Sequence, residues 1–409
     1  MRFVRRAIAP VPTATLRALA ARAGWLLESP DVVRCGLGGS ALAWELPESG
    51  AASPPPFPAT TLAGDDGPAG SGVVALGSLP FERSRPGTLH VPRILVTQDR
   101  HGGAWVTSRG PVPDLAALLA GVDEPSQAPV GVRSVSYAPT PEEYAHRVAR
   151  AVERLRHGEL AKVVLARAVL GTATEEVDPA ALAQRLRTRE PHCTLYSLPL
   201  RSGRRYVGAS PELLVRREGE TVTCHPLAGT IALPSHVAPD DYEAWLLGSH
   251  KNRHEHDILV QDILDTLRGA YDVAADAAPS IVALRSIAHL GTWVTGTHRG
   301  PGPAPSALDL LRRLHPTAAV GGIPRESAES LIGALEGRPR GPYAGPVGWI
   351  DAEGDGEWWI GIRGVLLRGA AFEAWAGAGI VDESDPIAER EETRDKLLSV
   401  LSALLSDQV

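Results

Sequence analysis

The chain has 409 residues, of which 44% are hydrophobic and 22% charged, as is typical of a globular protein with one large domain or two ordinary ones. Its formal net charge of -7 excludes a basic surface for nucleic acid, and no run approaches the roughly 18 apolar residues of a membrane span. Three cysteines without metal-binding spacing (Cys35, Cys193 and Cys224) indicate a reducing compartment. We therefore expect a cytoplasmic protein without nucleic-acid or membrane partners.

Residues 1 to about 130 carry only short β-like runs separated by segments rich in proline and glycine. This composition favours a β-rich portion of a larger domain over a flexible linker. The runs are Ala41–Leu46, Val73–Leu76, Arg93–Thr97 and Ala104–Val106.

From residue 140 the pattern becomes clearer. Thr140 to Glu143 form a capping box with proline at the first helical position, and we expect that helix to end at Gly158. An apolar run, Lys162–Val169, predicts a buried strand. Further helices are expected at Asp178–Arg187, Tyr242–Arg268 and Pro386–Leu405, and further strands at Thr194–Leu200, Arg205–Val207, Leu213–Arg216, Val365–Leu367 and Ala371–Ala374. This order predicts an α+β fold with mostly antiparallel strands.

Lysine is rare in this chain. Of the 41 basic residues only Lys162, Lys251 and Lys396 are lysine, and the others are arginine. Arginine stays protonated in proteins, whereas lysine can lose its proton in a suitable environment. Each lysine is therefore a candidate for chemistry that arginine cannot perform, although three could also survive by chance.

Two residues are candidates for proton transfer. Lys162 begins an apolar strand, where it is either a general base at a dry site or a side chain that reaches solvent from the strand end. Glu212 lies on a turn before another strand, where it is either a proton donor or an ordinary turn acid.

Carboxylates gather in two distant helical segments. Glu255 lies inside one, and Glu389, Glu392 and Lys396 share a helical face in the other. Carboxylates from two helices suit Mg²⁺, although charged faces are more often simply solvated. We also interpret Leu227–Thr230 and Gly377–Gly379 as glycine turns whose amides could receive a carboxylate.

In order along the chain, these segments resemble the chorismate-utilising enzymes, which include anthranilate, aminodeoxychorismate, isochorismate and salicylate synthases. The resemblance covers about residues 140 to 400 and is weak in the N-terminal third. The matching segments are KVVLARA, GASPELLV, HPLAGT, KNRHEHDILV, AHLGTWVTG, LHPTAAVGGIP, WIGIRGVLL, AGAGIVDESDP and the closing E-x-x-E-T-x-x-K.

The resemblance implies one chorismate-binding domain over residues 1–409, with a divergent portion (1–135) and a motif-bearing portion (136–409). It implies two large, mostly antiparallel sheets flanked by helices, with the active site between the two halves of the chain. It implies Mg²⁺ as cofactor and chorismate as substrate, and a monomer without an obligatory amidotransferase partner. The downstream pathway stays open among the biosynthesis of menaquinone, a siderophore, salicylate and a specialised metabolite.

The resemblance also assigns roles to residues. Glu255 and Glu392 are the expected Mg²⁺ ligands, with Glu389 and Asn252 as outer residues; many relatives have an acid where this chain has Asn252. The expected receptors of the ring carboxylate are Gly229, Thr230 and Lys396. Those of the enolpyruvyl carboxylate are Arg363, Gly377 and Gly379. His289 is expected to be a catalytic residue beside the reacting ring, and Ala319 is expected to bind the substrate.

Within the family, the resemblance selects the reaction. Members that add water carry lysine at Lys162, whereas ammonia-using members carry Gln or Asn there. Lys162 is therefore expected to take a proton from water as it attacks C2, while Glu212 protonates the departing C4 hydroxyl. This predicts an isomerase, isochorismate synthase.

Three alternatives remain at this point. The first is a salicylate synthase; these enzymes share the lysine but usually have threonine near Ala319. The second is an ammonia-using subunit, because Leu26–Ser29 resembles the tryptophan-feedback motif of anthranilate synthases, and the third is a non-catalytic chorismate-binding protein. An aminodeoxychorismate synthase is not expected, because those enzymes usually have lysine where Ala228 stands.

Overall fold

The computed structural model describes residues 1–46, 57, 61–126, 128–233 and 239–406. Its helices are α1 (Thr13–Ala23), α2 (Leu115–Leu119), α3 (Pro141–Arg156), α4 (Pro179–Arg189), α5 (Pro239–Gly248), α6 (His250–Leu267), α7 (Ala307–Leu314), α8 (Arg325–Glu336) and α9 (Pro386–Leu404). Its strands are β1 (Arg2–Ala7), β2 (Trp25–Glu28), β3 (Val32–Leu46), β4 (Thr61–Gly64), β5 (Val74–Ser78), β6 (Gly87–Asp99), β7 (Ala104–Arg109), β8 (Val132–Ala138), β9 (Lys162–Ala173), β10 (Thr194–Pro199), β11 (Arg205–Ser210), β12 (Leu213–Glu218), β13 (Thr221–His225), β14 (Leu227–Ala232), β15 (Tyr271–Ala275), β16 (Ser280–Ala283), β17 (Ile287–Gly291), β18 (Val294–His298), β19 (Gly322–Ile323), β20 (Pro346–Asp351), β21 (Gly356–Ile360), β22 (Gly364–Arg368) and β23 (Ala371–Ile380).

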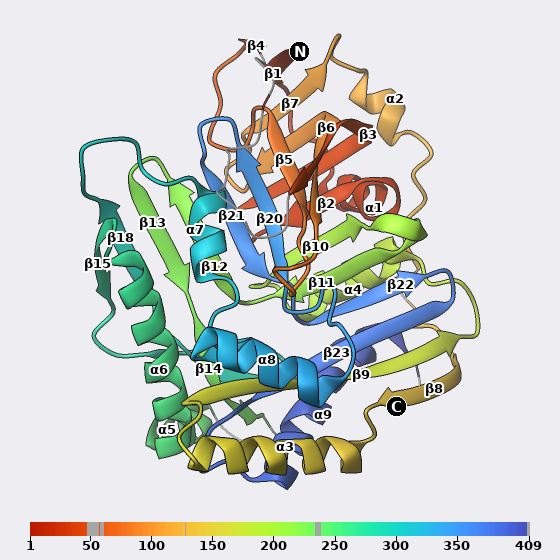
Figure 1. The fold of residues 1–409 in the computed structure, drawn as a ribbon. Helices are drawn as coiled ribbons and strands as arrows, with labels where there is room; N and C mark the ends of the chain where they lie inside the picture. The colour runs from red at the N-terminus through yellow and green to blue at the C-terminus, as the bar shows by residue number, and fades with distance from the viewer. Residues whose placement is uncertain (47–56, 58–60, 127, 234–238, 407–409) are drawn as a thin grey trace.

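The strands confirm the α+β class and the antiparallel character expected from the sequence (Figure 1). Within the described residues, hydrogen bonds join 20 strands into one continuous network, and β14, β17 and β16 form a separate three-stranded sheet. The two sheets are therefore unequal in size, whereas the resemblance implied two large ones. Almost all the pairings are antiparallel; β1 and β4 run parallel.

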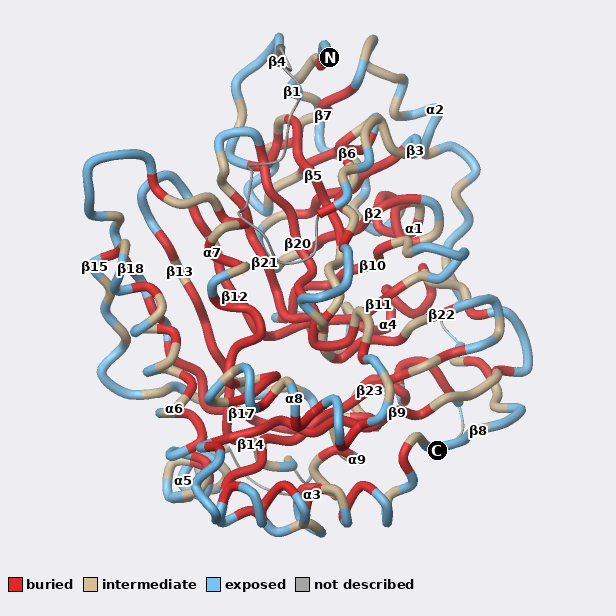
Figure 2. The backbone as a smooth tube through the Cα atoms, in the orientation of Figure 1, coloured by how far each residue is buried: buried red, intermediate tan, exposed pale blue. Residues whose placement is uncertain are grey.

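Strands β9 and β23 form a largely buried pair in the lower part of the molecule as it is drawn in Figure 2. They pair over ten residues, from Val163 opposite Ile380 to Thr172 opposite Ala371. The run KVVLARAV is apolar apart from Lys162 and Arg167, and it is buried because helices α8, α3 and α9 all pack on β9. This packing makes β9 a rigid support for the residue that begins it, Lys162.

The hydrophobic core joins the first 135 residues to the rest. One buried cluster contains Phe3 and Leu89 together with Leu165 and Ile380, and a second joins the helix α1 to α4 and α9. Shared cores of this kind support the predicted single domain, which stays a prediction. None of the helices in the described part of the chain has the length and apolar character that crossing a membrane requires.

Local sequence signals predicted several helix ends correctly. Thr140 and Glu143 form the expected capping box at the start of α3, and Asp178 caps α4. The prediction of one continuous helix over Tyr242–Arg268 was wrong. It is divided into α5 and α6 because Ser249 leaves the helix and its hydroxyl accepts a hydrogen bond from the Asn252 amide, as a new helix cap.

The glycine segments also differ from expectation. Leu227–Thr230 lies in β14 and Gly377–Gly379 lies in β23, so both are strands and not turns. The reason is close packing: a Cβ at Gly379 would lie 2.0 Å from Glu255 Oε1. Only Gly229 has a turn-like backbone, with φ +71°, at a bulge in the β14–β17 ladder.

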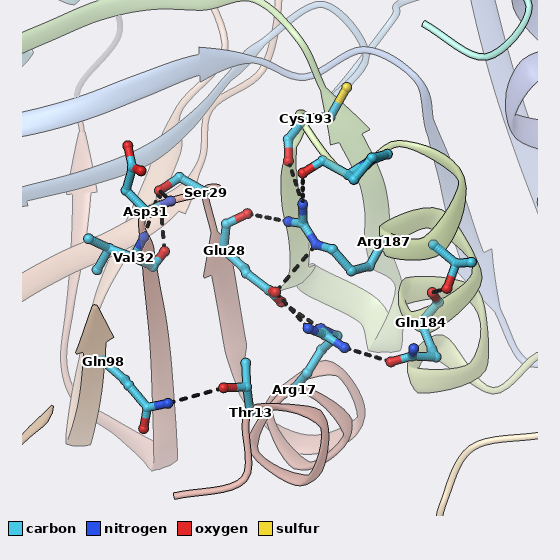
Figure 3. Close-up of polar contacts among 12 residues, drawn as sticks. Thr13, Arg17, Glu28, Ser29, Asp31, Val32, Gln98, Gln184, Arg187 and Cys193 are labelled. Carbon is cyan, nitrogen blue, oxygen red and sulfur yellow. Dashed lines mark hydrogen bonds and ion pairs between the residues drawn. The ribbon is translucent and has the colours of Figure 1, made fainter. Parts of the chain in front are cut away.

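The segment Leu26–Ser29 forms β2 and the turn after it (Figure 3). The Glu28 carboxylate accepts two hydrogen bonds of 2.6 Å from Arg17, and Arg187 Nε lies 3.3 Å from it. All three side chains are largely buried, so the protein's own arginines satisfy this carboxylate. The segment that resembles a feedback motif therefore contains a glutamate that is ion-paired within the protein itself.

Candidate active site

A pocket is lined by residues that lie between Val164 and Lys396 in the sequence. Strands β9, β14, β17 and β23 and helices α6 and α9 all contribute to its wall. The predicted site residues that line it are Glu212, Thr230, Glu255, His289, Ala319, Arg363, Gly377, Gly379 and Lys396.

The other predicted residues lie next to this wall or behind it. Lys162 is fully buried, with 0% of its surface exposed, and its Nζ lies 3.0 Å from Oε1 of Glu255, which does line the cavity. Gly229 packs on Asn252, whose backbone oxygen would be 2.9 Å from a Cβ at Gly229. Glu392 is held by Lys396, at 2.6 Å.

Glu212 lies between β11 and β12 and is 5% exposed. Burial raises its pKa to about 7, against the opposing effects of the Leu227 backbone amide and of Lys162, Lys396 and Arg363. A carboxyl group with this pKa is partly protonated at neutral pH and can donate a proton. This property distinguishes Glu212 from an ordinary turn acid.

Glu255 titrates in the opposite direction. Burial alone would raise its pKa, but the neighbouring ammonium groups of Lys162, Lys251 and Lys396 lower it below its usual value. Glu255 is therefore an anion in contact with a buried cation. Two buried glutamates on one cavity thus have pKa values shifted in opposite directions.

A second pair of carboxylates lies on α9. Lys251 Nζ is 2.6 Å from Glu389 Oε1, so each of the three lysines of the chain contacts a different glutamate of the predicted metal site. Burial and the neighbouring Glu392 raise the pKa of Glu389 to about 7, against the effect of Lys251. These contacts place three carboxylates and three ammonium groups beside one cavity.

This donor set fits Mg²⁺ by its chemistry, since carboxylate oxygens are the ligands that Mg²⁺ prefers. Oε2 of Glu389 is buried and makes no hydrogen bond of normal geometry to the described residues, although the Ser384 hydroxyl helps to lower its pKa. The described side chains do not form a group of three His, Cys, Asp or Glu arranged to hold a metal ion. Each of the three carboxylates forms an ion pair with a lysine.

Arg363 provides the cavity with a buried positive charge. It is 8% exposed, its φ of +53° lies in the left-handed region, and its Nε makes no hydrogen bond to the described residues. Its Nη2 lies 3.0 Å from Nε2 of His289, a neutral acceptor. A buried guanidinium that forms no ion pair with the carboxylates of the described residues is suited to receive an anion.

The outer edge of β23 faces the same cavity. Strand β22 pairs with β23 only as far as Ala374, so among the described strands none pairs with that edge beyond this point. Lys396 donates to the Gly377 carbonyl at 3.1 Å, and the Gly377 amide bonds to the Tyr343 hydroxyl. The glycines therefore bring the strand backbone, and not a turn, to the cavity.

The lining residues that sequence reasoning missed include Tyr343, Arg340 and Trp375. Tyr343 stacks on Trp375 with ring centroids 5.7 Å apart. The one available signal was an aromatic residue inside the glycine- and proline-rich segment GPYAGP. Arg340 is bonded to Glu336 and to the Val320 and Val164 carbonyls, a role that no local pattern predicts.

Comparison with known proteins shows the family of the chain. A family model described as "Chorismate binding enzyme" matches residues 72–405. The MenF protein of Mycobacterium tuberculosis (strain H37Rv) is 41% identical over 356 residues, covering 83% of this chain and 88% of the relative. Isochorismate synthase EntC of Escherichia coli K12 is 32% identical over 334 residues, covering 80% of each. The solved structure of E. coli MenF shares the fold, with a TM-score of 0.79, 23% identity and coverage of 98% of this chain and 94% of that one.

The chain belongs to the family of chorismate-binding enzymes. The relatives confirm the prediction, made from the sequence, of an enzyme of the isochorismate synthase type, which is an isomerase.

Proposed function

We propose that this cavity interconverts chorismate and isochorismate in a reversible, Mg²⁺-dependent reaction with Lys162 as general base and Glu212 as general acid. The observation that carries the proposal is that Glu212 lines the cavity, while Lys162 is buried behind its wall in contact with Glu255. Lys162 is fully buried, and Glu212 carries a pKa of about 7 that Lys162 helps to set. A general acid works best with a pKa near the working pH.

The reaction balances without a further reactant. Water attacks C2 of chorismate and gives a proton to Lys162, the ring double bonds shift, and Glu212 protonates the hydroxyl that leaves C4 as water. In the reverse direction Glu212 takes the proton and Lys162 returns one. The product differs from chorismate in the position of one hydroxyl group.

Two receptors orient the dicarboxylate substrate. Arg363 binds the enolpyruvyl carboxylate, because it is a buried cation that forms no ion pair with a carboxylate in the described part of the chain. Thr230 and Lys396, which line the cavity close to the glutamates, bind the ring carboxylate. Ala319 lines the wall beside the ring.

Glu255 and Glu392 would hold Mg²⁺, with Glu389 and Asn252 in the outer positions. When bound, the ion supplies a positive charge that fixes the ring carboxylate. Around it, the lysines hold the three carboxylates in place. Asn252 is buried where many relatives have an acid, which lowers the negative charge of the site by one.

The proposal is tested by incubating the protein with chorismate and Mg²⁺, without ammonia, and separating the products by liquid chromatography. We expect isochorismate in equilibrium with chorismate, without pyruvate, and no turnover in EDTA. Salicylate with pyruvate would favour the salicylate synthase reaction. Product only after addition of ammonia would favour an anthranilate-type reaction, and binding without any product would favour a non-catalytic protein.

A further inference from the structure

Three side chains of the cavity form a continuous hydrogen-bonded chain. Thr230 Oγ1 lies 3.0 Å from Nδ1 of His289, and Nε2 of the same ring lies 3.0 Å from Nη2 of Arg363. Antiparallel pairing places Thr230 of β14 directly opposite His289 of β17, next to the bulge at Gly229. Arg363 reaches the ring from the segment between β21 and β22. The imidazole therefore bridges two otherwise separate parts of the wall.

The partners of His289 fix the position of its proton. A guanidinium can only donate hydrogen bonds, so Nε2 must accept from Arg363, and in a neutral ring the hydrogen is then on Nδ1. From there it faces the Thr230 hydroxyl and the Gly229 carbonyl. A second proton would set two donors against each other at Nε2.

The surroundings also oppose protonation of this ring. Burial and the neighbouring cations Arg363 and Lys396 hold the pKa of His289 well below its usual value, and only the Gly229 carbonyl favours the charged form. His289 is 6% exposed. A neutral ring with both nitrogens bonded to protein is poorly placed to exchange protons with a substrate.

We infer that His289 is a positioning residue, a neutral spacer that fixes the distance between the Thr230 hydroxyl and the Arg363 guanidinium and so matches the two receptors to a dicarboxylate. This inference rests on the proposed function, and it replaces the catalytic role expected for His289 from the sequence. By accepting from His289 Nδ1–H, the Thr230 hydroxyl keeps its own hydrogen for the ring carboxylate. Arg363 depends on this contact because its Nε makes no hydrogen bond to the described residues.

The first test observes the proton directly. In the wild-type protein labelled with ¹⁵N-histidine, the His289 signals are identified among those of the 13 histidines by their loss in His289→Gln. We expect a neutral ring protonated on Nδ1 from pH 6 to 8.5, before any substrate is added. An imidazolium in this range, or a ring protonated on Nε2, would overturn the inference whether or not the protein turns over chorismate.

The second test separates orientation from proton transfer. Gln can place an acceptor near the Nε2 position, whereas Leu removes both hydrogen bonds. Loss of a hydrogen bond to a charged group corresponds to a change of about 10-fold or more, so His289→Leu should raise the KM for chorismate by ~10-fold or more with a smaller change in kcat. His289→Gln should recover most of that KM, and neither variant should shift the pH profile of kcat/KM.

Three results would contradict the inference. One is a fall of kcat by ~100-fold or more in both variants at unchanged KM, as expected for a lost acid or base. Another is a pH limb that disappears in His289→Gln, and the third is equal KM values for the two variants. Circular dichroism checks that each variant folds, and should His289→Leu not fold, the Gln variant and the wild-type spectrum still decide. If the wild-type protein gave no isochorismate, the proposed function would fail while the ¹⁵N result would stand separately.

Discussion

Lys162, the proposed base, is ion-paired with Glu255, a proposed metal ligand, at 3.0 Å. The pair is buried, with side-chain exposures of 0% and 10%. The proposed base and a proposed metal ligand therefore share one buried ion pair, so a change at either residue acts directly on the other.

Replacing Lys162 tests its role as base. Lys162→Gln should lower kcat for isochorismate formation by ~100-fold or more, because general-base catalysis contributes on the order of 10²- to 10⁴-fold. Lys162→Arg keeps the charge but cannot give up its proton, so it should be similarly inactive. Turnover is measured by chromatography and chorismate binding by calorimetry. Turnover of Lys162→Arg near the wild-type rate would exclude a base at this position.

The Lys162–Glu255 pair should show strong energetic coupling. Removing one partner leaves a buried charge unpaired, at a cost of about 3–5 kcal/mol when no proton is gained or lost. Lys162→Met and Glu255→Gln should each lower the free energy of unfolding, and the double variant should lose at least ~1 kcal/mol less than the sum. Denaturant unfolding measures all three. Additive effects would mean that the contact contributes nothing to stability.

Glu212 should make stability depend on pH. Its folded-state pKa of about 7 lies above the ordinary value of 4.5, so its contribution is fully present below pH 4.5 and is lost as the pH rises through 7. Glu212→Gln removes this loss. The variant should therefore gain stability relative to wild type between pH 4.5 and 8, by on the order of 3 kcal/mol at most. Chemical unfolding at both pH values measures the gain, and an equal difference at the two would refute the raised pKa.

Metal binding is tested on α9. Glu392→Gln should weaken Mg²⁺ binding, measured by calorimetry, by ~10-fold or more, since even outer residues of metal sites contribute 10- to 100-fold. Glu391→Gln is the matched control, because Glu391 is adjacent but bonds to the surface arginines Arg390 and Arg394. Equal Mg²⁺ affinity in the two variants would remove Glu392 from the metal site.

The sequence predicted those features that depend on local chemistry. The capping box at Thr140 and the apolar run after Lys162 specified α3 and β9, because helix caps and buried strands leave signals within a few residues. The pairing of each lysine with a glutamate could not be predicted, since Lys162 and Glu255 are 93 positions apart and meet only through tertiary packing. The prediction of a turn at Gly379 was wrong for a related reason. A glycine is needed there because the Glu255 carboxylate packs against the strand, and a single sequence does not distinguish a glycine needed for close packing from a glycine needed for a turn.

The N-terminal third resisted prediction more than the rest. Its predicted strands are present in the structure. Helix α1 and strand β1 were not predicted, because their apolar patterns are short and interrupted by arginine. The Glu28 carboxylate forms ion pairs with Arg17 of α1 and Arg187 of α4. The residues next to Glu28 in β2 could not predict these ion pairs, because both arginines come from other elements.

The central claim is that Lys162 activates water to attack C2 of chorismate. It is tested most directly by running the reaction in H₂¹⁸O with Mg²⁺ and without ammonia, followed by mass spectrometry of the products at early times. The account predicts isochorismate that carries one ¹⁸O in its new hydroxyl group, without pyruvate, and no labelled product from Lys162→Gln. Unlabelled isochorismate, or labelled isochorismate formed equally fast by Lys162→Gln, would contradict it.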